Sequence, residues 1–122
     1  MTPNIGDIIG VKYCPVRPQP KFKYLVCLDP LKMIGFVINT ENREHFYCIP
    51  ILKKDHSFLK WDSFISCSNP ISYEEKNITA IHSSLSRNEI IELYNHVNSA
   101  KKLSLIQKKP ILQNLDSWLI KN

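Results

Sequence analysis

The chain has 122 residues, which is the usual size of one domain and too short for two. Hydrophobic residues make up 43% and charged residues 22%, a globular composition that excludes a chain disordered throughout. The formal net charge of +5 fits either a polyanionic ligand or an ordinary solvated basic surface. Only three glycines accompany eight prolines, which argues against a glycine-rich phosphate loop and for rigid turns.

The first seven residues, MTPNIGD, contain no basic start and no apolar stretch, so we do not expect a signal peptide. No run in the chain approaches the roughly 18 apolar residues that a membrane-spanning helix requires. We therefore expect a cytoplasmic protein without membrane contact.

Short strands are predicted along the first two thirds of the chain. Residues 5–13 show the alternation of a half-buried strand at Ile9, Val11 and Tyr13. Short runs rich in β-branched and aromatic residues indicate further strands. These runs are 22–29, 34–40, 45–52, 62–68 and 76–81.

The segment between the first two strands, 14–21, is both stiff and basic. It contains three prolines, which cannot pair in a central strand, so it is predicted to be a loop. From Lys12 to Lys23 the chain has four basic residues and no acidic one, the other two being Arg17 and Lys21. Prolines reduce the entropy lost on binding, so this loop is a candidate ligand contact.

Two helices are predicted after the strands. Ser86 and Glu89 form an S-x-x-E capping box at the start of a helix over about 87–102, which carries an apolar stripe suited to the core. A second short helix is predicted over about 111–120, because Pro110 suits a first helical position. It would pack either on the strands or on a partner.

These elements predict a single mainly-β domain with C-terminal helices, in which a barrel or sandwich occupies about residues 5–82. No helix separates the early strands, so we do not expect a parallel α/β sheet.

Cysteine and histidine spacing gives no support for a metal or a cofactor. No two of these residues show the short paired spacing of a zinc site, and we expect the cysteines to be reduced and buried as small hydrophobes. The residues concerned are Cys14, Cys27, Cys48, Cys67, His45, His56, His82 and His96.

Four segments in order resemble the MazF/PemK-type toxin family. Residues 6–9 (GDII) are similar to the family's G-D-I-V opening, and residues 23–28 (KYLVCL) to its R-P-x-L-V-L strand. Residues 62–72 (DSFISCSNPIS) are similar to the family segment S-x-V-x-C-D-Q-x-R-T, and residues 85–90 (LSRNEI) to its L-S-x-x-E-L ending. The resemblance covers about residues 5–103.

The resemblance implies a small SH3-like barrel of five to seven strands, assembled as a homodimer. It also implies metal-independent endoribonuclease cleavage of single-stranded RNA and a small antitoxin protein as partner. Such cleavage requires proton transfer at the 2′-hydroxyl and at the leaving oxygen, and positive charge near the phosphorane.

Carried over residue by residue, the family's catalytic Arg corresponds to Lys23 and its Ser or Thr to Ser72. The Pro beside that Arg corresponds to Tyr24, and the family's Asp-Gln pair to Ser68 and Asn69. Lysine supplies charge to a phosphate as a point charge, without the two-pronged fork of arginine. Both candidates also have ordinary structural interpretations, Lys23 as a solvent-facing strand residue and Ser72 as a turn residue.

Aromatic residues lie among the basic ones, as expected for a protein that holds RNA by stacking and charge. The predicted RNA-binding residues are Arg17, Lys21, Tyr24 and Trp61. An alternative is a non-catalytic barrel that binds nucleic acid, or a protein partner through its last helix. RNA binding without cleavage would favour that alternative.

Overall fold

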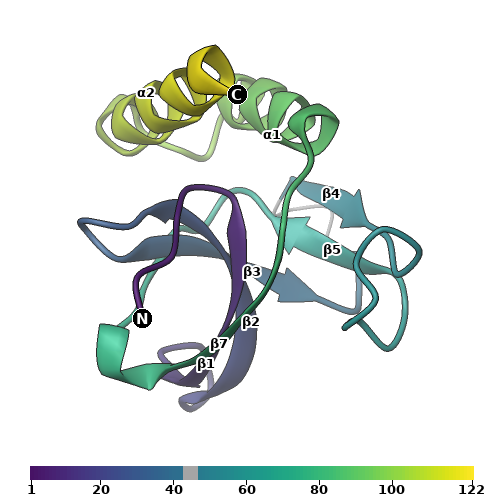
Figure 1. The fold of residues 1–122 in the computed structure, drawn as a ribbon. Helices are drawn as coiled ribbons and strands as arrows, with labels where there is room; N and C mark the ends of the chain where they lie inside the picture. The colour runs from purple at the N-terminus through teal and green to yellow at the C-terminus, as the bar shows by residue number, and fades with distance from the viewer. Residues whose placement is uncertain (43–46) are drawn as a thin grey trace.

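The computed structural model describes residues 1–42 and 47–122. Within these ranges the chain forms seven strands, followed by two helices that pack together on one side of the sheet (Figure 1). The strands are β1 (Asp7–Cys14), β2 (Lys21–Asp29), β3 (Ile34–Asn39), β4 (Cys48–Ile51), β5 (Ser63–Ser66), β6 (Ile71–Ser72) and β7 (Ile78–Ser84). A 3-10 turn, η2 (Glu75–Asn77), precedes β7, and the helices are α1 (Arg87–Ser99) and α2 (Leu105–Lys121).

The strands form one antiparallel sheet in the order β4-β5-β3-β2-β1-β7, with β6 pairing the far end of β3 beyond β5. The sheet curls strongly (Figure 1) but is not closed, since β4 and β7 end the strand order. The predicted mainly-β fold with C-terminal helices is therefore confirmed, and the curled sheet is that of a small, open, SH3-like barrel.

Strand alternation gives the curled sheet two apolar faces. On β2, Val26 and Leu28 point into a large cluster shared with both helices, and Leu25 points to the opposite face. There a smaller cluster is built mainly from β1, β2 and β3. The same alternation carries Lys21 and Lys23 to the side of the smaller cluster, which positions the site described below.

The opening Gly-Asp pair is a structural junction. Gly6 has a φ of 86°, a conformation that favours glycine, and an added Cβ would lie 3.0 Å from Cδ1 of Ile90. Its carbonyl accepts a hydrogen bond from the Leu85 amide, and Asp7 accepts one from the Ser84 hydroxyl at 2.6 Å. The pair thus ties the start of β1 to the end of β7 and the start of α1.

The second helix is longer than predicted. It begins at Leu105 rather than after Pro110, because Ser104 and Gln107 form a second capping box that the sequence analysis overlooked. Pro110 lies inside the helix and cannot donate to the Ile106 carbonyl, and Ile106 is exposed, so water can satisfy that oxygen. The correction extends the helix to Leu105–Lys121.

The remaining boundaries differ by a few residues from the predicted ones. The strand predicted at 62–68 is β5, which is shorter, and the short strand β6 was not predicted. The strand predicted at 76–81 is η2 followed by β7. The predicted strand 45–52 is observed as β4, and its first two positions lie outside the described residues. Neither helix in the described part of the chain is long and apolar enough to cross a membrane.

Candidate functional site

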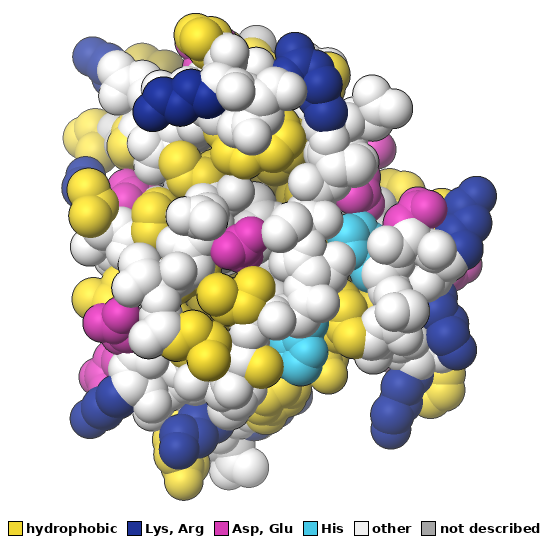
Figure 2. All heavy atoms as spheres, in the orientation of Figure 1, with side chains coloured by type: hydrophobic (Ala, Val, Ile, Leu, Met, Phe, Trp, Pro, Cys, Tyr) yellow, Lys and Arg dark blue, Asp and Glu magenta, His cyan; other side chains and the backbone are white. Residues whose placement is uncertain are grey.

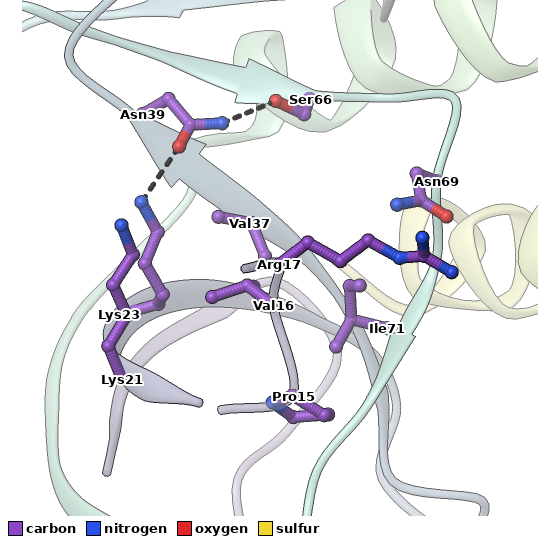
Figure 3. A pocket seen from close by; sticks show the side chains of 10 residues that line it. All are labelled: Pro15, Val16, Arg17, Lys21, Lys23, Val37, Asn39, Ser66, Asn69 and Ile71. Atoms are coloured by element: carbon purple, nitrogen blue, oxygen red, sulfur yellow. Dashed lines mark hydrogen bonds between the residues drawn. The ribbon is translucent and has the colours of Figure 1, made fainter. Parts of the chain in front are cut away.

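A cavity of about 430 Å³ opens beside the smaller core cluster (Figure 3). Its described lining combines three cations, two amides and a hydroxyl with a floor of apolar side chains, and it contains no carboxylate. The lining residues are Pro15, Val16, Arg17, Lys21, Lys23, Val37, Asn39, Ser66, Asn69 and Ile71.

The three cations come from two adjoining segments. Lys21 and Lys23 lie on the same face of β2, two residues apart, and Arg17 comes from the proline-rich loop that precedes this strand. Figure 3 shows Arg17 reaching across the cavity toward Asn69, opposite the two lysines. Three of the sequence-predicted residues, Arg17, Lys21 and Lys23, are therefore brought together around one concave site.

A hydrogen-bonded chain lines one side of the cavity. The Lys23 ammonium donates to Oδ1 of Asn39 at 2.7 Å, and Nδ2 of Asn39 donates to the Ser66 hydroxyl at 2.8 Å (Figure 3). The Ser66 oxygen also lies 3.8 Å from Sγ of Cys48. The chain crosses β2, β3 and β5, so the sheet itself fixes where the ammonium sits.

Ser72, the second predicted catalytic residue, lies elsewhere. It is exposed on β6 and lines a neighbouring cavity together with Tyr13 and Pro15. Pro15 lines both cavities, whereas Lys23 lines only the first. The structure thus separates the two residues that the resemblance paired.

The two aromatic residues predicted to stack on RNA are also outside the cavity. Tyr24 is half-buried on the opposite face of β2, with ring centroids 5.1 Å from Phe22, 4.9 Å from Phe58 and 5.2 Å from His82. Trp61 is 60% exposed and does not line the cavity. Tyr24 is thus part of an aromatic cluster that joins the loop before β5 to β2 and β7.

A second polar group is buried on that opposite side. His56 is 3% exposed, its Nδ1 lies 2.6 Å from the Ser83 hydroxyl, and its Nε2 lies 2.9 Å from Oε2 of Glu89. Because a carboxylate only accepts, Nε2 is the donor to Glu89. Glu89 also closes the capping box of α1 by accepting from the Ser86 amide. His56 therefore holds the loop before β5 against β7 and α1.

All four cysteines carry free thiols. Cys14, Cys27 and Cys67 are buried as predicted, whereas Cys48 is only partly buried. Burial raises the pKa of the Cys27 thiol from its ordinary 9.0 to about 11, despite the neighbouring Tyr73 hydroxyl at 3.6 Å. Burial also raises the pKa of Cys14 and of Cys67. Among residues 1–42 and 47–122, no cluster of His, Cys, Asp and Glu side chains could hold a metal ion. His45 lies outside the residues that the structure describes.

Charge is not spread evenly over the molecule. On the face shown in Figure 2 the Lys and Arg side chains lie scattered around the rim, with uncharged atoms over most of the middle. The grouping of Arg17, Lys21 and Lys23 comes from the lining of the cavity.

Sequence reasoning missed three polar residues that line the cavity, namely Asn39, Ser66 and Asn69. Asn69 stands where the resembled family has a glutamine, which was a usable signal. The pairing of Asn39 with Ser66 depends on β3 lying beside β5, and no local pattern indicates that contact. No protein-family model matches the chain, and no curated protein is significantly similar to it.

Proposed function

We propose that this protein binds single-stranded RNA, with a backbone phosphate held in the cavity among Arg17, Lys21 and Lys23. The observation that carries the proposal is the grouping of these three cations around a concave site of about 430 Å³ whose described lining has no carboxylate. Lysine and arginine side chains that line one cavity from opposite sides favour a polyanionic ligand.

The shape of the site favours a single strand over a duplex. The phosphates of a double helix lie on a convex surface, so their usual partner is an open basic face. Here the cations surround a hollow bounded by the proline-rich loop on one side and β3 on the other. A flexible strand can turn one phosphate into such a hollow at little cost.

The uncharged lining suits ribose. Asn39, Asn69 and Ser66 offer amide and hydroxyl groups, which can both donate to and accept from a 2′-hydroxyl. This feature favours RNA over DNA in the same site. In this arrangement the three cations, and not the uncharged residues, contact the negatively charged phosphate.

Binding is tested by fluorescence anisotropy with a labelled single-stranded RNA of about ten nucleotides. We expect Lys23→Gln to weaken binding about tenfold and to reduce the slope of log K against log salt by about 0.7. The matched control is Lys54→Gln, because Lys54 is exposed and lies outside the cavity lining. Equal affinity and slope for all three proteins would contradict the proposed site.

Cleavage of the bound RNA is a second candidate function, as in a toxin of the MazF/PemK type. The favouring observation is the chain from Lys23 through Asn39 to Ser66, which fixes an ammonium where a phosphorane would need positive charge. Ser72 is the residue suggested by the resemblance, and Ser66 is the hydroxyl that the cavity supplies.

The two candidates are separated by incubating the protein with labelled RNA in EDTA and resolving the products. Cleavage lost in Lys23→Gln would support the enzyme, and Ser66→Ala and Ser72→Ala would identify the hydroxyl involved. Growth arrest on expression, relieved by Lys23→Gln, is the matching result in cells. RNA binding without products would leave a non-catalytic RNA-binding domain.

A further inference from the structure

Tyr13 is the most unusual side chain beside the cavity. It is 68% exposed, although it stands near the end of a strand whose other large hydrophobic residues are buried. Its φ is 56°, a left-handed conformation that is uncommon for a residue of this kind. Backbone conformations of this type are concentrated at functional sites, where the surrounding structure maintains them.

A β-bulge produces this conformation. Val11 pairs with Lys23 and Cys14 pairs with Lys21, so β1 uses one more residue than β2 between the two pairs. The extra residue disrupts the ladder at Lys12 and Tyr13 and turns the Tyr13 ring outward. The bulge therefore couples the direction of this ring to the strand that carries both cavity lysines.

The ring of Tyr13 lines a second cavity of about 590 Å³, which has an apolar floor. Its apolar lining comes from Val11, Pro15, Pro20 and Tyr73, and its polar and charged lining from Ser72, Glu74, Lys76 and Asn77. A mostly apolar hollow with few polar groups is the usual form of a site for a flat organic ring.

The two cavities are adjacent because Pro15 lines both. One offers three cations and the other an exposed aromatic ring with an apolar floor. A nucleotide has the same two parts, a phosphate and a flat base, linked by one sugar. Lys12 adds a charge nearby, with its Nζ 6.0 Å from the centre of the Tyr13 ring.

We propose that Tyr13 is a stacking platform for the nucleobase next to the phosphate bound among Arg17, Lys21 and Lys23. This inference rests on the proposed RNA binding and names the second half of that site. Tyr13 takes the role that the sequence assigned to Tyr24 and Trp61. Ser72 and Asn77 also line the second cavity and offer polar groups for the edge of the stacked base.

The test compares two ligands and two variants. The ligands are a single-stranded RNA of about six nucleotides and an abasic ribose-phosphate oligomer of the same length. Tyr13→Phe keeps the ring, and Tyr13→Asn removes it while retaining a residue that tolerates the left-handed backbone. Circular dichroism checks that both variants remain folded.

We expect the wild-type protein and Tyr13→Phe to bind the RNA about 5- to 100-fold more tightly than the abasic oligomer. Tyr13→Asn should bind both ligands equally, at the affinity of the abasic one. If the wild-type protein binds both ligands equally and Tyr13→Asn matches it, the stacking inference is wrong and phosphate binding stands. If the wild-type protein binds neither ligand, the proposed RNA binding fails and the stacking role fails with it.

Discussion

Two hydrogen-bonded groups on opposite faces of the same sheet differ in how they are enclosed. Lys23, Asn39 and Ser66 form a chain at the edge of an open cavity, where the cation still faces a hollow. His56 is enclosed by Ser83 and Glu89, and 3% of its surface is exposed. The first group lines a space that a ligand can fill, whereas the second is enclosed within the protein.

This difference separates binding from stability. No buried side-chain nitrogen or oxygen lacks a hydrogen-bond partner in the described part of the chain. Removing a member of the enclosed group leaves its partners without a hydrogen bond, which lowers the free energy of unfolding. Replacing Lys23 leaves its half-buried partner Asn39 facing the cavity, so the cost should appear in ligand affinity instead.

The largest expected effect is that of His56→Ala on stability. We expect it to lower the free energy of unfolding by about 2–4 kcal/mol, because it leaves a cavity and removes the hydrogen-bond partner of Glu89 and Ser83. Lys23→Gln should lower it by less than about 1 kcal/mol. Urea denaturation followed by circular dichroism measures both. Equal destabilisation by the two substitutions would remove the distinction between the two groups.

A smaller effect is expected for Asn39→Asp, which changes charge without changing shape. The new carboxylate would lie beside the Lys23 ammonium, which the Asn39 oxygen contacts at 2.7 Å, and would neutralise part of the cavity charge. We expect RNA affinity to fall about 5- to 30-fold, corresponding to about 1–2 kcal/mol, with little loss of stability. Anisotropy at two salt concentrations checks this, and tighter RNA binding would contradict a phosphate site here.

The sequence predicted the fold well where local patterns determine it. The strand β1 and the Ser86–Glu89 capping box follow from neighbouring residues, and the structure has both. The predicted alternation within β1 was wrong, because Asp7 to Val11 are all buried and Tyr13 is exposed. The predicted start of α2 was wrong, because Pro110 lies inside the helix and the local signal for its start is the capping box of Ser104 and Gln107. The short strands β5 and β6 both pair with β3, and local sequence patterns do not reveal such tertiary pairing.

The candidate site was less predictable than the fold. The cations of the loop and β2 are close in sequence, so their grouping followed from composition alone. Strand alternation places Tyr24 on the face opposite Lys23, so this aromatic residue could have been excluded from the site. The exposed ring of Tyr13 depends on a bulge, since strict alternation would have buried it with Ile9 and Val11.

The smallest expected effect concerns the Cys27 thiol, which contacts the Tyr73 hydroxyl. These two groups are neutral, in contrast to the His56–Glu89 pair on the opposite face of the sheet. Burial raises the pKa of Cys27 from 9.0 to about 11, so between these values the unfolded chain loses a proton that the folded chain keeps. Stability from this thiol is therefore complete below pH 9 and is lost as the pH rises toward 11, by less than about 1 kcal/mol at pH 9.5.

Cys27→Ser isolates that contribution, because a serine hydroxyl can still contact Tyr73 and does not ionise in this range. Urea denaturation between about pH 8 and pH 9.5 should show a shallower loss of stability for the variant than for the wild-type protein. Cys14 and Cys67, whose pKa values are also raised by burial, keep titrating in both proteins and serve as an internal reference. Parallel pH profiles would mean that Cys27 is hydrated, and the core beneath the cavity would then be more open than the one that encloses His56.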